Sequence, residues 1–155
     1  MTAQQHRAVQ AWVRLAASNA AMTRSFNASL QAGHGLTVND FEVLRRLSLE
    51  PEGRMRRVDL AQVVSLTPSG ITRLLDGLER SGLVRKDVCE ADGRVTYACI
   101  TDEGDATLAS AARSHLSALE AIFAERYTSE ELESLAELLG RLPGAADADE
   151  ECPSG

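Results

Sequence analysis

The chain has 155 residues, 44% hydrophobic and 25% charged, which is enough apolar material for one folded domain with additional helices but too little for a second catalytic domain. Aromatic residues make up 4% and there are only four prolines, so the composition favours helices over a β-sandwich or β-barrel. Sixteen basic and twenty-three acidic residues give a net charge of -7, a balance that over the whole chain argues against nucleic-acid binding.

The charge is distributed unevenly. Between Arg54 and Thr101 there are eight basic and six acidic residues, a local balance of +2, so the flanking residues together carry -9. A locally basic segment inside an acidic chain is typical of a DNA-contacting module joined to an assembly module.

No targeting or metal-binding signal accompanies these features. The first twelve residues lack a basic region followed by an apolar run, and no stretch of 18 apolar residues occurs, which predicts a cytoplasmic protein without membrane contact. The three cysteines, Cys89, Cys99 and Cys152, show no CxxC spacing and no histidine close in sequence, so we expect reduced thiols and no metal or other cofactor site.

Three helices are predicted in the first 64 residues. Residues 4–31 contain no proline or glycine and place apolar residues at helical spacing, and glycines at 33 and 35 end this first helix. Thr37, with Asp40 three positions on, is a capping signal for a second helix that buries Phe41. After a turn at residues 51–53, a short third helix is expected over 58–64.

A fourth helix is predicted at about 67–81, with two distinct faces. Thr67 suits the N-cap, Pro68 the first helical position and Gly82 the left-handed residue that follows a helix. At 100° per residue the apolar positions fall on one side. The opposite side carries Ser69, Thr72, Arg73, Asp76 and Arg80.

A β-hairpin is expected next, because residues 83–89 and 95–100 are rich in β-prone residues and are separated by a short polar turn. Asp92-Gly93 is expected to supply a positive-φ turn, with Arg94 at or near the tip. Thr101 then caps a long helix to about Tyr127, and a last helix runs from Ser129 to Pro143.

This order predicts a mainly α fold with a small β-hairpin wing, that is, a winged helix-turn-helix. The chain resembles the MarR family of bacterial transcriptional regulators from about Gln10 to Leu142. The sharpest match is the wing pattern, Asp92-Gly93-Arg94 followed after five residues by Ile100-Thr101, in which Ile replaces the usual Leu. The run 69–76 and the exit Gly82-Leu83-Val84-Arg85 also resemble the family's recognition helix and its end.

The resemblance implies a ligand-responsive repressor that binds a palindromic operator as a homodimer. Residues 36–101 would form the DNA-binding domain, residues 1–35 and 102–143 the dimerisation region, and residues 144–155 are predicted to be a disordered acidic tail. The resemblance also implies a small aromatic or phenolic effector, and we predict that Trp12, Phe41 and His115 lie near its binding pocket.

The fourth helix and the strand after it supply five predicted DNA contacts. Ser69, Thr72 and Arg73 are expected in the major groove, where arginine makes a bidentate contact with guanine. Arg85 and Lys86 are expected to contact phosphates.

The wing supplies the minor-groove contact. Arg94 is attracted by the negative potential of a narrow groove, and Asp92 is expected to orient it through a charge-assisted bond. Arg54, Arg56 and Arg57, where the family more often has polar capping residues, receive no assigned role.

Several alternatives stay open on the residues alone. Asp76 and Arg80 suit an intrahelical ion pair. Trp12, Phe26 and Phe41 suit a core or dimer interface. The chain as a whole would also suit a winged-helix interaction module without DNA binding, or a redox-sensing regulator. For the last of these, Cys89 and Cys99 stand on opposite strands in an unknown register. No arrangement of nucleophile and base, paired carboxylates or glycine-rich phosphate loop indicates an enzyme.

Overall fold

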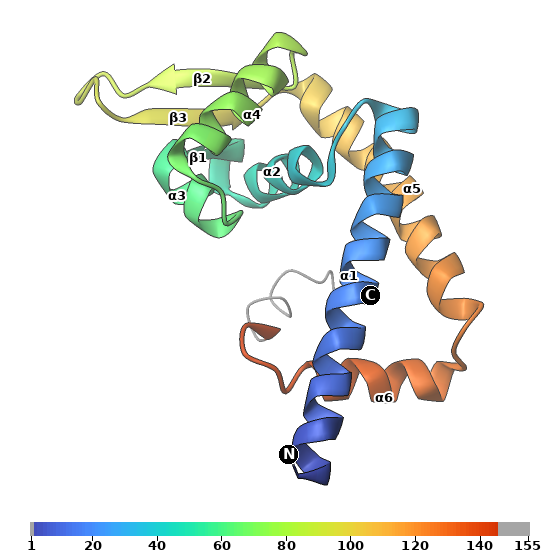
Figure 1. The fold of residues 1–155 in the computed structure, drawn as a ribbon. Helices are drawn as coiled ribbons and strands as arrows, with labels where there is room; N and C mark the ends of the chain where they lie inside the picture. The colour runs from blue at the N-terminus through green and yellow to red at the C-terminus, as the bar shows by residue number, and fades with distance from the viewer. Residues whose placement is uncertain (1, 146–155) are drawn as a thin grey trace. The chain divides into compact units, whose positions relative to one another are not determined.

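The computed structural model describes residues 2–145, and the chain divides after His115 into two compact units. Ten elements follow one another along the chain (Figure 1). They are α1 (Ala3–His34), α2 (Val38–Leu49), a 3-10 turn (Pro51–Gly53), β1 (Arg54–Arg56), α3 (Arg57–Val63), α4 (Pro68–Arg80), β2 (Val84–Val88), β3 (Thr96–Ile100), α5 (Asp102–Ala124) and α6 (Ser129–Leu139). The predicted tail lies, from residue 146, outside the described residues, and so does Cys152.

The helix ends follow local capping chemistry. The Thr37 hydroxyl accepts from the Asp40 N–H at 3.1 Å while the Asp40 carboxylate accepts from the Thr37 N–H at 2.8 Å, which satisfies two free donors at the start of α2. Gly35 adopts a left-handed φ of 68° and ends α1. These boundaries agree with the sequence-based prediction to within a few residues.

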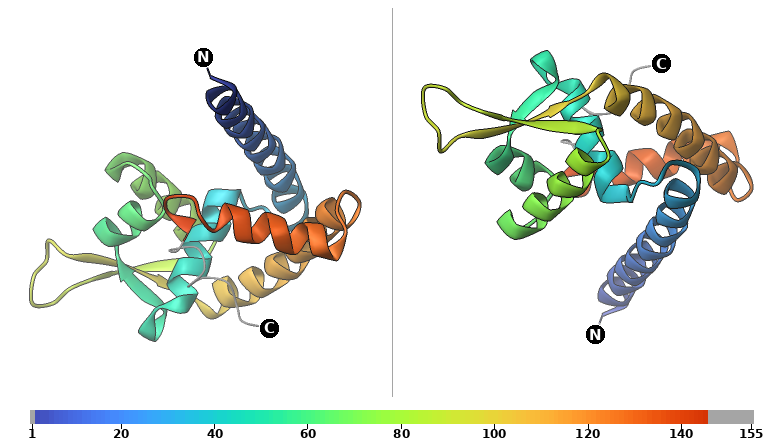
Figure 2. Two further views of the ribbon diagram at one scale, coloured as in Figure 1. Left: turned by 90° about the horizontal axis from the view of Figure 1, so that it is seen from below. Right: turned by 90° about the horizontal axis from the view of Figure 1, so that it is seen from above.

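The sheet has one strand more than the sequence predicted. Its order is β1-β3-β2, all antiparallel, so β3 is the central strand and β1 lies on the side away from the hairpin partner. In this register Cys99 lies opposite Arg54 on one side and Arg85 on the other. Figure 2 shows the hairpin of β2 and β3 extending beyond α3 and α4.

The turn of the hairpin differs from the expected type. Gly93 is not among the described residues with positive φ, so the predicted positive-φ turn was wrong. Instead, the Asp92 carboxylate accepts the Arg94 N–H at 3.0 Å, and the Asp92 carbonyl accepts the Val95 N–H at 3.0 Å. An aspartate that bonds the backbone two residues on forms a turn without needing glycine's conformational freedom.

The core of the first unit lies among α2, α3, α4 and the sheet. The residues with almost no exposed surface come from all four. They include Val43, Leu44, Leu47, Leu60, Ile71, Leu75, Val84 and Ala98. The end of α1 adds Leu30 and the start of α5 adds Leu108 and Ala111, so both long helices are anchored to the winged domain by apolar contacts.

The first turn of α5 packs directly on the loop before β2. The Thr101 hydroxyl accepts from the Gly104 N–H at 3.0 Å and donates to the Gly82 carbonyl at 2.6 Å, and the Thr101 N–H donates to the Leu83 carbonyl at 3.1 Å. Gly104 is buried, and a β-carbon built on it would lie 2.1 Å from the Leu83 carbonyl oxygen. The helix approaches the loop this closely because residue 104 has no side chain.

The rest of the chain is less covered. Of the 32 residues of α1, only Phe26 and Leu30 are buried, and α6 buries none of its residues. No helix among the described residues is long and apolar enough to span a bilayer.

Candidate nucleic-acid interface

The helix α4 is built so that one face packs and the other remains available. The Thr67 hydroxyl accepts from the Gly70 N–H at 3.0 Å, Pro68 starts the helix and Gly82, with φ 74°, follows its end. Ile71, Leu75 and Leu78 are buried. Thr67 is therefore the N-cap, as the sequence predicted, and the opposite face of α4 points away from the core.

The three predicted major-groove residues lie on that outer face. Ser69 and Arg73 are exposed and Thr72 is half-buried. The Thr72 hydroxyl donates to the Pro68 carbonyl at 2.8 Å, so its lone pairs are left to accept from donors in a groove. No described hydrogen bond or ion pair engages the Arg73 guanidinium, whose five donors are free for an external acceptor.

Lys86 has partners that the sequence did not reveal. Its ammonium group, on β2, forms a short ion pair with Asp76 of α4 and a second at 3.2 Å with Glu79. The bond to Asp76 raises the pKa of Lys86, and the Lys86 ammonium holds the pKa of Asp76 below its usual value, with smaller effects from Arg80 and Arg57. Asp76 is thus paired with Lys86 across α4 and β2, in place of the predicted ion pair with Arg80, whose charge only lowers the pKa of Asp76. The phosphate contact of Lys86 stays a prediction.

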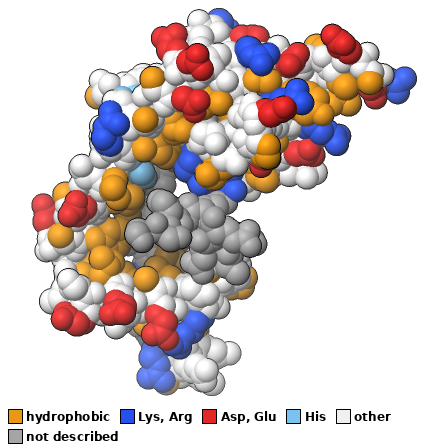
Figure 3. All heavy atoms as spheres, turned by 180° about the vertical axis from the view of Figure 1, so that it is seen from behind, with side chains coloured by type: hydrophobic (Ala, Val, Ile, Leu, Met, Phe, Trp, Pro, Cys, Tyr) orange, Lys and Arg blue, Asp and Glu red, His pale blue; other side chains and the backbone are white. Residues whose placement is uncertain are grey.

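The remaining predicted contacts lie along the wing. Arg85 is 62% exposed, with one N–H 3.5 Å from the Asp87 carboxylate. Arg94 is exposed and its guanidinium has no partner among the described side chains, while Asp92 binds the Arg94 backbone rather than its side chain. Figure 3 shows acidic and basic side chains together near the end of the projecting hairpin.

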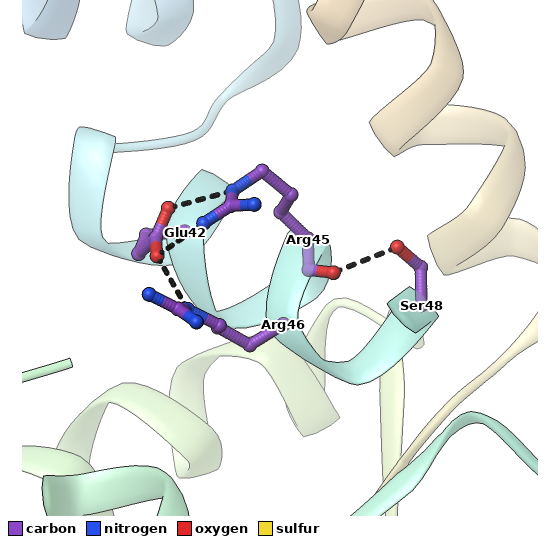
Figure 4. Close-up of polar contacts among 4 residues, drawn as sticks. All are labelled: Glu42, Arg45, Arg46 and Ser48. Atoms are coloured by element: carbon purple, nitrogen blue, oxygen red, sulfur yellow. Dashed lines mark hydrogen bonds and ion pairs between the residues drawn. The ribbon is translucent and has the colours of Figure 1, made fainter. Parts of the chain in front are cut away.

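Other arginines of the first unit are already engaged. On α2 the Glu42 carboxylate accepts from Arg45 Nε at 2.9 Å and Nη2 at 2.8 Å, and from Arg46 Nε at 2.9 Å (Figure 4). Burial opposes ionisation of Glu42, but the two guanidinium groups outweigh it and lower its pKa. Arg45 and Arg46 are therefore structural, unlike Arg73 and Arg94.

The sheet register separates the two wing cysteines. Cys99 lies opposite Arg85, whereas Cys89 follows β2 and donates its N–H to the Val95 carbonyl at 2.9 Å. The cysteines are thus offset by four positions, about 13 Å along a strand, whereas a disulfide requires Cα atoms within about 7 Å. Burial also raises the pKa of the Cys99 thiol, which disfavours the reactive thiolate. The intramolecular thiol switch considered from the sequence does not fit this geometry.

Two of the three predicted pocket residues meet. The His115 ring lies 5.3 Å from the Phe41 ring and 4.5 Å, edge-on, from the Phe26 ring. Trp12 is 69% exposed on α1 and does not join them. Phe26, which the sequence placed among the core or dimer-interface residues and not in the pocket, lies against His115.

His115 is partly buried, and one nitrogen of its imidazole lacks a hydrogen bond among the described residues. Its Nδ1 atom is buried and has no hydrogen-bond partner among the described residues, and burial lowers the pKa of the imidazole. The unfolded chain then binds a proton at residue 115 more readily than the folded chain. The contribution of His115 to the free energy of unfolding is therefore fully present above the ordinary histidine pKa of about 6.5, and it is lost as the pH falls through the lower pKa of the folded chain.

We therefore expect His115→Leu to gain stability relative to the native chain as the pH is lowered from 7.5 to 5.5, because the variant has no imidazole to protonate. Urea unfolding at fixed protein concentration across this range measures the effect, with His6→Gln on the exposed part of α1 as control. If the free energies of unfolding of His115→Leu and the native chain differed by the same amount at all pH values, the assignment of His115 as a buried imidazole with a lowered pKa would be contradicted.

The helices α2, α3 and α4 are followed by the hairpin of β2 and β3. This order, with an outward polar face on α4 and an arginine at the wing, defines a winged helix-turn-helix protein. The sequence profile of the MarR family matches residues 36–96. The repressor YetL of Bacillus subtilis is 34% identical over 111 residues, covering 72% of this chain and 66% of YetL, so about a third of YetL lies outside the match. An HTH-type transcriptional regulator of Bacillus cereus is 31% identical over 108 residues, 69% of each chain.

The solved structure of Sco3205, a MarR family regulator from Streptomyces coelicolor in complex with DNA, is similar to this fold. Its TM-score is 0.75 at 27% identity, covering 90% of this chain and 85% of Sco3205. The chain belongs to the MarR family, a family of DNA-binding transcriptional regulators.

Proposed function

We propose that the chain is a transcriptional repressor that binds a palindromic operator as a homodimer, with α4 in the major groove and Arg94 of the wing in the minor groove. The observation that carries this proposal is the pair of exposed guanidinium groups, Arg73 on α4 and Arg94 on the hairpin, whose donors no described side chain uses. An interaction module without DNA binding would have no need of either group. YetL, a relative of this chain, is described as a repressor.

Exposed apolar side chains support the dimer. Val9, Trp12 and Val13 of α1 are each at least half exposed, and α6 exposes Leu138 at 56%. Apolar surface of this extent on long helices is normally covered by a partner, and a second copy of the chain provides the same surface under two-fold symmetry. Two recognition helices would then reach half-sites about 10 bp apart.

The effector is proposed to be a small aromatic or phenolic anion near Phe41 and His115. The two rings, together with Phe26, offer aromatic faces and an unpaired imidazole nitrogen in one place. An aromatic ligand with a phenolic or acidic group matches both features, because it stacks on the rings and donates to or accepts from the imidazole.

The proposed function is tested by mobility shift of the purified dimer on the DNA beside its own gene. We expect a complex that resists random competitor DNA and weakens with salt. Arg94→Ala is expected to lower the affinity about 5- to 150-fold for each protomer whose wing enters the minor groove, which corresponds to about 1–3 kcal/mol. Arg141→Ala, at an exposed position two residues past the end of α6, is the control. A folded dimer that binds all duplexes equally, or none, would favour the interaction-module alternative.

A further inference from the structure

Two arginines with no assigned DNA contact, Arg56 and Arg57, lie with Arg94 of the wing around one small hollow of the first unit. Arg56 and Arg57, at the junction of β1 and α3, and Arg94 of the wing surround a cavity of about 50 Å³, together with Val58, Val95 and Thr96. No carboxylate is among its lining residues. We call this cavity the arginine hollow.

The sheet register explains why residues so far apart in sequence meet there. Arg56 lies opposite Tyr97 in the antiparallel pairing of β1 with β3. The chain after Arg56 therefore runs beside the chain before Thr96, which brings the start of α3 next to Arg94. The extra strand β1, which the sequence did not predict, thus places two arginines beside the base of the wing.

The guanidinium groups retain most of their donors. Arg57 and Arg94 make no side-chain hydrogen bond or ion pair among the described residues. Arg56 has one contact, from Nε to the Asp59 carboxylate at 3.6 Å, with both side chains about half exposed. A guanidinium has five N–H donors in a fixed fork, so even Arg56 keeps several for a further acceptor.

The size and charge of the hollow select its ligand. Its volume is several times the roughly 10–15 Å³ that one water molecule requires, which leaves room for a small tetrahedral oxyanion. Planar guanidinium forks match the oxygens of phosphate in a bidentate manner, and a lining with three arginines and no carboxylate favours an anion.

We infer that the arginine hollow binds one phosphate group per protomer. The phosphate comes from the DNA backbone, next to the minor groove that receives the wing, and this assignment rests on the proposed function. Free inorganic phosphate has the same recognition chemistry. Arg56 and Arg57, which received no role in the sequence analysis, are then binding residues.

The first arm of the test measures how duplex affinity depends on salt for the full-length dimer. Each phosphate neutralised on duplex DNA contributes about 0.9 to the slope of log affinity against log salt, so releasing one phosphate in each protomer reduces the slope by about 1.8. We expect this reduction for Arg56→Gln plus Arg57→Gln on both operator and random duplex, because a backbone phosphate carries no sequence information. Arg7→Gln plus Arg14→Gln, which removes two exposed arginines of α1 outside residues 36–101, should leave the slope unchanged, and size-exclusion chromatography checks that this variant keeps the oligomeric state of the native chain.

The second arm titrates inorganic phosphate into the DNA-free protein and follows the arginine Nε–Hε signals by NMR. Shifts of the Arg56 and Arg57 signals that chloride does not produce, and that the double variant lacks, show that the hollow binds phosphate directly. Such shifts with an unchanged salt slope would support free phosphate as the ligand. The NMR shifts are also expected if the proposed function is wrong and the native dimer binds no DNA, so the two failures can be told apart. An unchanged slope together with absent shifts overturns the inference.

Discussion

Replacing Arg73 with alanine is expected to weaken operator binding by the proposed dimer by about 2–6 kcal/mol, since the substitution would remove from each of two protomers the proposed base interaction, worth about 1–3 kcal/mol. Arg73 is exposed on α4 and has no partner among the described residues, so the substitution removes nothing that stabilises the folded chain. Fluorescence anisotropy with operator and random duplexes at one salt concentration measures the change.

The comparison between duplexes identifies the kind of interaction. If Arg73 reads a base, the variant binds operator DNA much more weakly but random DNA almost as well as the native dimer, whereas a phosphate interaction affects both duplexes equally. Arg80→Ala, at the last residue of the same helix, is the control for helix propensity and charge, and we expect less than a threefold effect. Equal weakening by Arg73→Ala and Arg80→Ala would mean that Arg73 does not read a base.

Replacing Gly104 with alanine is expected to lower the free energy of unfolding by about 3 kcal/mol, the upper part of the range for overpacked sites. The added carbon would lie 2.1 Å from the Leu83 carbonyl oxygen and 2.8 Å from Ile100 Cγ1, so backbone has to move. The helix preference of alanine over glycine, about 1 kcal/mol, acts in the opposite direction and is too small to compensate. Urea unfolding monitored by circular dichroism measures the difference.

Gly77 offers a matched control within α4. A β-carbon there meets nothing closer than Arg80 Nη2 at 4.0 Å, so Gly77→Ala is expected to be neutral or stabilising by up to about 1 kcal/mol. If both variants unfold at the same urea concentration, the close approach of α5 to Leu83 does not restrict residue 104. Equal protein concentrations are required, because dimerisation itself adds stability.

The helices were predictable because their signals are local. Thr37 with Asp40, and Thr67 before Pro68, lie within four residues of the groups they satisfy, and apolar spacing identified the buried face of α4. The outward placement of Arg73 followed from the same periodicity. The family assignment was predicted from the wing pattern and is confirmed by the comparisons.

The remaining features depend on contacts between distant parts of the chain. β1 has only three residues, too few for alternation to be visible, and it exists because β3 pairs with it. Lys86 finds Asp76 ten residues away only once β2 folds back along α4. The offset of Cys89 and Cys99 is a matter of register, which the sequence leaves open when turn length is uncertain.

The link from Lys86 to Asp76 and Glu79 has a consequence for how the proposed effector would act. It joins α4 and the wing, the two elements proposed to read DNA, by charge-assisted contacts, while β1 joins the wing to α3 through the sheet. Bending the wing away from α4 would break the Lys86 ion pairs and strain the pairing of β1 with β3, so we expect the winged domain of each protomer to move as a rigid body. Effector binding is then expected to change the distance and angle between the winged domains of the two protomers, and to leave the arrangement of α4 and the wing within each protomer unchanged.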